Sequence, residues 1–212
     1  MKIFLNSFIP LCTSKLGKQA VKQFGLFPFI DGSCRREPDF EANYPAITSL
    51  CRMKKLIPRL EIGDLVIYVT SKKQYYNKAK ERRFVAILQV IKFANTHNQA
   101  MDWYNDNDEK VSQNIICDKT DPLPLNHTHQ ISRHNGEVNL NRWDAAYKLR
   151  MREYPKVAIC KIWGNRLNLV EPPILSNELM MQVFSRIPGT QNPPMLNHSE
   201  WLNFQNLVLQ KI

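Results

Sequence analysis

The sequence predicts an α+β fold built on a curved, mixed or barrel-like β-sheet with flanking helices. Runs rich in β-branched and aromatic residues predict three strands, at 65–70, 82–94 and 156–164. Amphipathic periodicity predicts three helices, at 14–24, 141–154 and 198–212. No internal repeat or low-complexity linker separates these elements, so we expect a single compact domain over 1–212.

The first hundred residues hold most of the predicted sheet. Residues 2–9 predict a short opening strand, and Ser14 is a suitable N-cap for the helix that follows. Residues 45–52 alternate between apolar and polar in a way that leaves both a strand and a short helix open. A Gly-Asp dipeptide at 63–64 marks a turn before the first long strand.

Residues 72–83 join the two strongest predicted strands and are unusually basic. Six of these twelve residues are Lys or Arg, two are Tyr and one is acidic. Because such a segment is too charged for a core, we expect an exposed hairpin loop or flap.

The pattern at 97–106 predicts a short helix with Ala100, Trp103 and Tyr104 on one side.

The second half predicts a loop-rich region at 105–140, followed by helices and a strand. Asn141 is the expected N-cap of the helix that begins there, and the Gly-Asn pair at 164–165 is the expected end of the third strand. A further helix is expected after the two prolines at 172–173. The last helix is expected to bury Trp201, Phe204, Leu207 and Val208.

Composition excludes several protein classes. With 43% hydrophobic residues, the chain can build a core and is not expected to be disordered. Its five dispersed cysteines form no Cys-x-x-Cys pair, which argues against a disulfide scaffold and is typical of a reducing cytosol. The apolar run at residues 1–12 is too short and too interrupted for a signal peptide, and no run approaches the roughly 18 residues of a membrane span. We therefore expect a cytoplasmic protein without membrane contact.

The positive charge is confined to one half of the chain. The net charge of the chain is +10. Residues 1–100 account for all of it, because they contain 17 Lys and Arg against 7 Asp and Glu. Residues 101–212 carry 12 positive and 12 negative side chains. A localised excess of this kind indicates a polyanion partner, above all a nucleic acid. The alternative is a set of lysines that are simply solvated on helix surfaces.

The segment at 31–45 combines carboxylates with arginines. Asp31, Glu37, Asp39 and Glu41 lie within eleven residues of the chain, beside Arg35 and Arg36. Cleavage of an N-glycosidic bond needs a carboxylate to stabilise positive charge on the sugar or to orient water, so Asp31, Glu37 and Asp39 are the candidate catalytic residues. The equally weighted alternative is an Arg–carboxylate network that only rigidifies the loop.

Other chemistries find little support. His127, His129 and His134 follow Cys117, but their spacing matches no zinc pattern, so we expect solvated histidines and no bound metal. Cys34 and Cys51 have no neighbouring His that would activate a thiolate. The sequence contains no P-loop, no Gly-rich dinucleotide fingerprint and no Gly-x-Ser-x-Gly elbow, so we expect no cofactor.

An ordered series of short motifs resembles a known family. After an aromatic-Pro segment come Cys51-Arg52, then Pro-Arg-Leu at 58–60, Gly-Asp-Leu-Val at 63–66 and Thr-Ser-Lys at 70–72. This order resembles the nucleotide modification associated domain of the second type, which is found with phage and bacterial DNA-modification or defence genes. The Gly-Asp strand is also similar to one in PUA-like barrels of the ASCH and EVE groups, which bind RNA or modified DNA bases.

The resemblance covers about residues 25–125, including a Cys–Pro-x-Pro-Leu segment at 117–125, with the helical elements of 141–212 packed on this core. The charged segment 31–41 departs from the family pattern. The resemblance implies a pocket for an extruded base in a curved sheet, which it places at Phe29, Ser33, Cys34, Tyr44, Tyr68 and Thr70. Phosphates beside an extruded base need cations, and the basic half of the chain supplies the candidate nucleic-acid contacts, which are Arg35, Arg36, Arg52, Arg59, Ser71, Lys72, Lys73, Tyr75, Arg82 and Arg83.

Three functions follow as hypotheses. The first is a DNA-binding protein that captures a modified or flipped-out base by base flipping, in antiviral defence or DNA modification. The second is a DNA glycosylase, a hydrolase that excises the captured base with a loop carboxylate. The third is a non-catalytic, PUA-type module that binds RNA or modified DNA. The expected partner is therefore DNA with modified bases, with RNA as the alternative.

Overall fold

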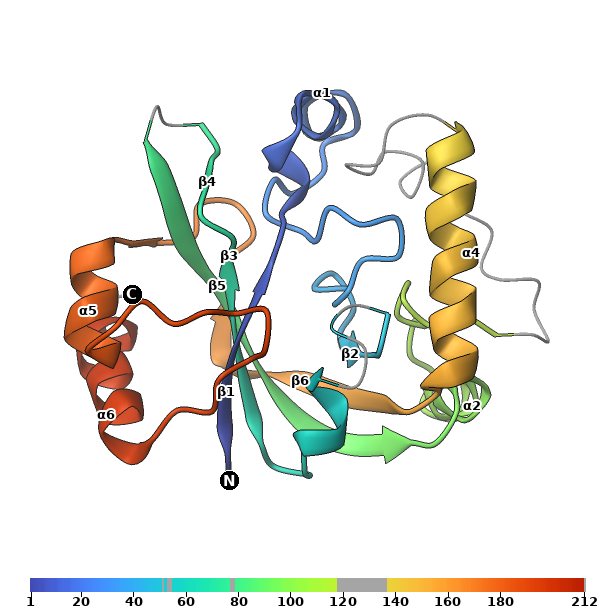
Figure 1. Ribbon diagram of the computed structural model, residues 1–212. Helices are drawn as coiled ribbons and strands as arrows, with labels where there is room; N and C mark the ends of the chain where they lie inside the picture. The colour runs from blue at the N-terminus through green and yellow to red at the C-terminus, as the bar shows by residue number, and fades with distance from the viewer. Residues whose placement is uncertain (51, 53–54, 77–78, 118–136, 212) are drawn as a thin grey trace.

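The computed structural model describes residues 1–50, 52, 55–76, 79–117 and 137–211 (Figure 1). The strands are β1 (Ile3–Phe8), β2 (Ala46–Ile47), β3 (Leu65–Thr70), β4 (Lys73–Gln74), β5 (Lys80–Ala94), β6 (Val157–Leu167) and β7 (Ile174–Leu175). The α-helices are α1 (Lys15–Phe24), α2 (His97–Asp106), α4 (Glu137–Glu153), α5 (Asn177–Phe184) and α6 (His198–Leu207). Short 3-10 helices are η1 (Leu11–Thr13), η3 (Ile57–Arg59) and η4 (Leu209–Lys211).

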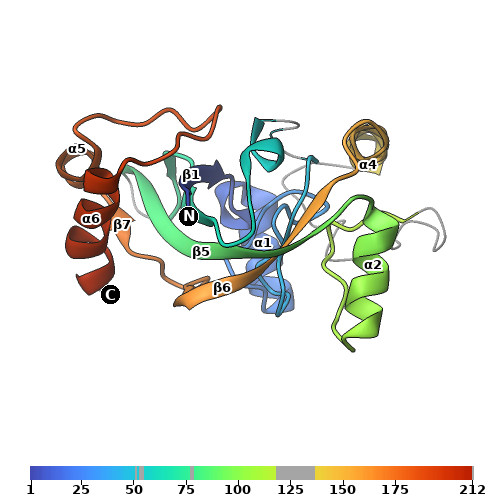
Figure 2. The same ribbon diagram turned by 90° about the horizontal axis from the view of Figure 1, so that it is seen from below.

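The strands form a mixed sheet of order β1-β3-β5-β6-β2, and β4 and β7 also pair with β5. The β1–β3 pair is parallel and the other pairs are antiparallel. Register shifts interrupt the pairing of β5 with β3 and with β6. Such bulges bend strands and increase their twist, and β5 and β6 curl visibly in Figure 2. The predicted α+β fold with a curved, barrel-like sheet is confirmed.

The two faces of the sheet are covered by different parts of the chain. Alternation along β1 and β3 sends Phe4 and Tyr68 to one apolar cluster, and Leu5 and Ile67 to another. Helices α5 and α6 cover the second face, on the left in Figure 1. The segment 26–60 packs on the first face, and α2 and α4 lie at the far end of the sheet.

The predicted long strands and helices are confirmed, with three corrections. The last helix ends at Leu207, which is only partly buried, and a short 3-10 helix follows it in place of the predicted α-helix up to 212. β6 does not end at the Gly-Asn pair, because it continues through Gly164 and Asn165, which both have positive φ, and bulges before Leu167 pairs with Ala86. α4 begins at Glu137, so Asn141 lies inside the helix and is not its N-cap. Ser14 does cap α1, since its hydroxyl accepts a hydrogen bond from the Gly17 amide at 2.9 Å.

The basic segment 72–83 forms the expected hairpin. β4 pairs with the start of β5, and Lys72, Lys73 and Lys80 are exposed. Tyr75 does not share this exposure, because its ring is buried. Among the described residues, no helix is both long enough and apolar enough to cross a membrane.

Candidate functional site

A cavity of about 470 Å³ lies between the sheet and α4. Its wall is formed by the C-terminal half of β1, by β3, by parts of the 31–52 segment, by α4 and by the segment that joins α5 to α6. The segment that joins α5 to α6 crosses β1 (Figure 1). Met195 of this segment forms an antiparallel β-bridge with Phe4 of β1. The cavity therefore brings together five regions that are separate in the sequence.

The charged segment is folded around the carboxylate of Asp31. Asp31 Oδ1 accepts hydrogen bonds from the Ser33 amide at 2.8 Å, from the Glu37 amide at 3.2 Å and from the Ser33 hydroxyl. The Arg36 guanidinium donates to the carbonyls of Asp31 and Ser33 at 2.9 and 2.8 Å. These local bonds satisfy the backbone of a segment that is almost wholly buried, not a solvated loop.

Glu37 is a buried carboxylate in the cavity wall. Thr48 donates to it through its amide at 2.7 Å and its hydroxyl at 2.6 Å, and the Asn114 side chain donates at 2.7 Å. Burial nevertheless raises the pKa of Glu37 to about 7, against the hydrogen bonds, which lower it. Near neutral pH this group can therefore hold or release a proton.

Arg35 ties the same segment to α4. Its guanidinium is fully buried and contacts Asp144 Oδ1 through Nε at 2.7 Å and Nη2 at 2.6 Å. Lys148, one turn further along α4, approaches the other oxygen of Asp144 at 3.1 Å. This buried ion pair positions α4 as the wall of the cavity.

Two arginines in the cavity wall form no ion pair within the described part of the chain. Arg52 donates to Asn6 Oδ1 at 3.3 Å and to the Ser7 carbonyl at 2.7 Å. Arg150 donates to the Leu50 carbonyl at 2.6 Å. Both positive charges are therefore held in place by neutral acceptors, so they stay available for an anionic ligand.

Aromatic side chains line the same space. Tyr68 of β3 lines the cavity and packs edge-on against Phe40, with ring centroids 5.3 Å apart. On α4, Trp143 and Tyr147 lie 6.2 Å apart, and Trp143 is 37% exposed. The cavity therefore presents flat apolar surfaces beside hydrogen-bonding groups.

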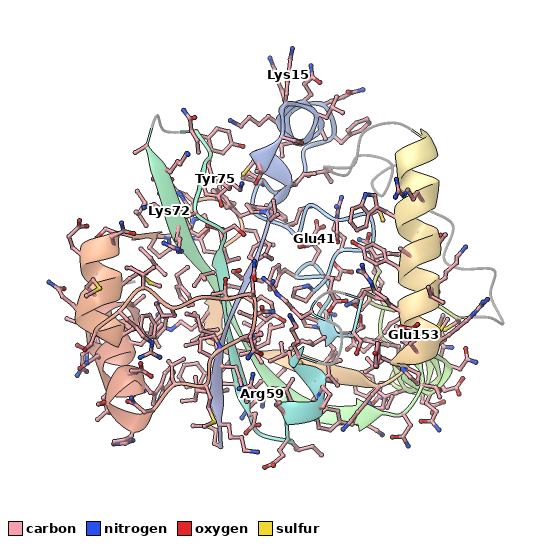
Figure 3. All side chains as sticks on the ribbon, viewed as in Figure 1. Lys15, Glu41, Arg59, Lys72, Tyr75 and Glu153 are labelled. Carbon is pink, nitrogen blue, oxygen red and sulfur yellow. The ribbon has the colours of Figure 1, made fainter. Side chains whose placement is uncertain are left out.

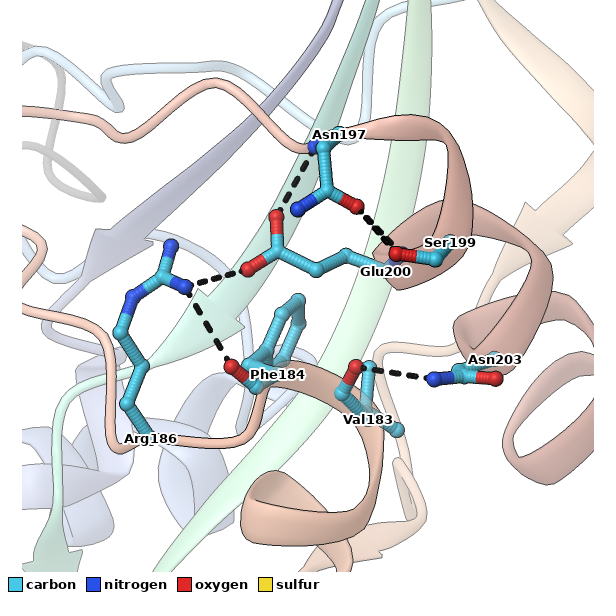
Figure 4. A network of polar contacts seen from close by, with 7 residues as sticks. All are labelled: Val183, Phe184, Arg186, Asn197, Ser199, Glu200 and Asn203. Atoms are coloured by element: carbon cyan, nitrogen blue, oxygen red, sulfur yellow. Dashed lines mark hydrogen bonds and ion pairs between the residues drawn. The ribbon is translucent and has the colours of Figure 1, made fainter.

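The segment between α5 and α6 closes one side of the cavity with Thr190 and Gln191. Thr190 is linked to Ser7 by a hydroxyl–hydroxyl contact of 2.5 Å. Figure 4 shows how the ends of the segment are fixed, with Arg186 bound to Glu200 at 2.5 Å and Asn197 capping α6. A capping box and an ion pair thus hold this wall against the sheet.

The structure brings together some of the predicted site residues. Those that line the cavity are Asp31, Glu37, Arg52, Tyr68 and Ser71. Asp39 does not line it, because its carboxylate is turned to the amides of Gln113 at 2.9 Å and Glu41 at 3.2 Å.

The other predicted base-pocket residues are packed outside the cavity. Phe29 packs on Tyr75, Tyr44 packs on Trp103, and the Thr70 hydroxyl accepts from the Arg83 amide. Ser33 and Cys34 are fully buried, and burial raises the pKa of the Cys34 thiol to about 12. These five residues do not line the cavity, because the core or a local hydrogen bond occupies them, and their pocket role stays a prediction.

The predicted phosphate contacts divide by exposure. Arg35, Arg36, Tyr75 and Arg83 are buried and not exposed to a phosphate in this structure, so their phosphate contacts stay a prediction. Arg83 instead pairs with Glu81 and donates to the Pro172 carbonyl. Arg59 and Arg82 are half-buried, and Arg59 donates to the Pro193 carbonyl at 2.6 Å. Among the predicted phosphate contacts, only Lys72 and Lys73 are exposed.

Sequence reasoning missed several cavity residues, namely Asn6, Ser7, Thr48, Trp143, Tyr147, Arg150 and Thr190. A signal existed for some of them. Asn6 and Ser7 interrupt an otherwise apolar strand, and Trp143, Tyr147 and Arg150 recur at helical spacing. Nothing in the local sequence marks Thr48 or Thr190.

Metal ligation finds no support among the described residues, which contain no cluster of three or more His, Cys, Asp or Glu suited to an ion. His127, His129, His134 and Cys51 lie outside the described residues, as does most of the segment 117–125. Comparisons of this chain with known proteins found no matching family model, no matching curated protein and no matching solved structure. The resemblance to the nucleotide modification associated domain therefore stays a prediction.

Proposed function

We propose that the cavity captures a single nucleobase, extruded from DNA and carrying a modification. The observation that supports this most strongly is the lining itself, in which the aromatic rings of Tyr68 and Trp143 share one space with Glu37 and with two arginines that form no ion pair with any described residue. A volume of about 470 Å³ falls in the range of roughly 300–1,000 Å³ that is usual for small-molecule sites.

Each part of this lining meets a physical need of base capture. Extrusion of a base costs a few kcal/mol of unstacking, which stacking on aromatic rings and hydrogen bonds to the base edge must offset. Trp143 and Tyr147 offer stacking surfaces, and Glu37, Thr48 and Asn6 offer polar edges. Arg52 and Arg150 suit the phosphates that flank the flipped nucleotide.

A modified pyrimidine in duplex DNA provides the direct test. Fluorescence anisotropy should show tighter binding to a duplex with one central 5-hydroxymethylcytosine, 5-methylcytosine or glucosylated hydroxymethylcytosine than to the unmodified duplex. Trp143→Ala should weaken binding to the preferred duplex about 5- to 150-fold, because one base–aromatic contact is worth about 1–3 kcal/mol.

Trp103→Ala is the matched control, since Trp103 packs on Tyr44 outside the cavity and should leave DNA affinity unchanged. Equal affinity for modified, unmodified and mismatched duplexes would contradict base capture. Preferential binding of single-stranded RNA would support the PUA-type RNA-binding alternative in its place.

Excision of the captured base is the second candidate function, and Glu37 favours it. A buried carboxylate with a pKa of about 7, in a cavity that Asp31 also lines, is suited to proton transfer. In the proposed reaction, a carboxylate takes a proton from water as the water oxygen bonds to C1′. The C1′–N bond breaks, and the base leaves with the bonding electrons and receives the proton that the carboxylate took from water.

Alkali treatment after incubation would reveal the abasic sites as strand breaks. Glu37→Gln should remove the breaks while retaining binding, whereas Asp39→Asn, a buried loop carboxylate outside the cavity, should retain both. If no modified duplex that the protein binds showed strand breaks, excision would be contradicted and base capture would be the remaining function.

A further inference from the structure

The lysines of α1 form a positive surface that the cavity does not use. Lys15, Lys18 and Lys22 line a shallow depression together with Thr13 and Gln19. Lys15 and Lys22 are exposed and stand seven residues apart, which places them on one face of the helix about two turns from each other. Figure 3 shows Lys15 pointing away from the body of the molecule.

The hairpin of β4 and β5 extends this surface. Lys18 donates to the Tyr75 carbonyl and lies 5.4 Å from the ring centroid of Tyr76, so α1 and the hairpin are in contact. Tyr76 is 56% exposed, and Lys73 and Lys80 on the hairpin are also exposed. An exposed aromatic ring among lysines is suited to contact with nucleic acid.

Carboxylates are scarce in the segments that build this surface. Residues 1–30 contain no Asp or Glu, and neither do residues 65–80. Glu81 lies in the hairpin opposite Lys73, but it is buried and paired with Arg83. Lys72 lies beside α5, where it donates to Asn177, so the positive surface consists of α1 and the outer hairpin.

The same two segments begin at the cavity wall. Ser71 lines the cavity, and Lys72 and Lys73 follow it directly. Ile9 also lines the cavity, and the chain reaches Lys15 six residues later. The chain connections therefore join both lysine-bearing segments directly to the cavity wall.

We infer that α1 and the β4–β5 hairpin form the surface that holds the phosphate backbone of DNA while the cavity takes the base. This inference rests on the proposed function. It assigns the backbone contacts to Lys15, Lys18, Lys22, Lys73 and Lys80, in place of the buried arginines of the 31–36 segment. The charge complementarity of this lysine-rich surface with a polyanion carries it.

The salt dependence of binding tests the inference. Each phosphate contact contributes about 0.9 to the slope of log K against log salt concentration. The double variant Lys15→Gln, Lys22→Gln should therefore lower that slope by about 2 for a duplex with one central 5-hydroxymethylcytosine. The matched control is Lys92→Gln, Lys161→Gln, which removes two exposed charges from β5 and β6 and should leave the slope unchanged.

The outcomes separate the two proposals. A lower slope in the α1 variant, with an unchanged ratio of affinities for modified and unmodified duplexes, supports the inference. An unchanged slope, or an equal change in the control, overturns it even if the wild-type protein still prefers the modified base. A wild-type protein that binds no DNA overturns both proposals. Thermal melting of each variant confirms that the exposed substitutions leave the fold intact.

Discussion

The α5–α6 layer and the 31–48 segment cover opposite faces of the sheet by opposite means. The helices pack apolar side chains such as Phe184 and Phe204 on the sheet, so this face is stabilised by the burial of apolar area. The 31–48 segment buries ionisable groups, Asp31, Arg35 and Glu37 among them, which are stabilised only by specific partners. Both faces bury apolar clusters, and Phe40 and Ile47 of this segment belong to one of them. The contrast teaches that only the face of the 31–48 segment adds buried ionisable groups around a cavity.

Phe204→Ala breaks the apolar face and has the largest expected effect. Phe204 is fully buried and lies 5.4 Å from Phe84 and 6.1 Å from Trp201 between ring centroids. We expect a loss of about 4 kcal/mol in the free energy of unfolding, measured by urea denaturation, with the DNA affinity of the folded fraction unchanged. Leu202→Ala, an exposed position on the same helix, should lose far less. Equal losses would contradict the assignment of this face to stability.

Asp144→Asn breaks the polar face. It leaves the buried Arg35 guanidinium without its opposite charge, so we expect a loss of about 3 kcal/mol, reduced by the one hydrogen bond that the Asn oxygen still accepts. Lys148→Gln removes only the more exposed partner and should change stability by less than about 1 kcal/mol. Urea denaturation checks both variants, and a stable Asp144→Asn protein would show that the pair does not hold α4.

Glu37→Gln sharpens the comparison through pH. The pKa of Glu37 is raised from 4.5 to about 7 in the folded state, so between these values the folded protein binds more protons than the unfolded chain. Wild-type stability therefore falls as pH rises through this window, by about 2 kcal/mol between pH 5 and 7 for this group. Relative to wild type, Glu37→Gln should gain that amount over the same range. Glu61→Gln, at an exposed carboxylate whose pKa is lowered by Lys2, should show no such gain.

Asn197→Ala tests the end of the segment that carries Thr190, and its expected effect is the smallest. Loss of this N-cap should cost about 1 kcal/mol, visible as a drop of a few degrees in the melting temperature. Asn203→Ala is the control, because its contact with the Val183 carbonyl is long, at 3.5 Å. If both variants melted like the wild type, the capping box would not stabilise this wall.

The sequence predicted the elements of this fold because their signals are local. The Ser14 cap lies three residues from the amide that it binds, and the alternation of β3 lies within six residues. The cavity could not be predicted in the same way. Arg35 meets Asp144 across 109 positions, and Arg52 meets Asn6 across 46, so neither partner could be read from nearby residues.

The charged segment shows the same limit at closer range. Its carboxylates correctly marked the wall of a cavity, through Asp31 and Glu37. Charge alone, however, favours exposure, and the prediction of phosphate contacts for Arg35 and Arg36 followed from it. Burial of these two arginines depends on an acceptor from α4 and on carbonyls that the fold of the segment itself turns inward.

Photocrosslinking tests the central claim, that the cavity holds the base, most directly. A duplex with 5-iodouracil at the target position would be irradiated in the complex, and the crosslinked peptides identified by mass spectrometry. Base capture predicts crosslinks to Tyr68, Trp143 or Tyr147, which line the cavity. Crosslinks confined to exposed aromatic residues outside it, such as Tyr76 or Phe27, would show that the base stays at the surface and would contradict the claim.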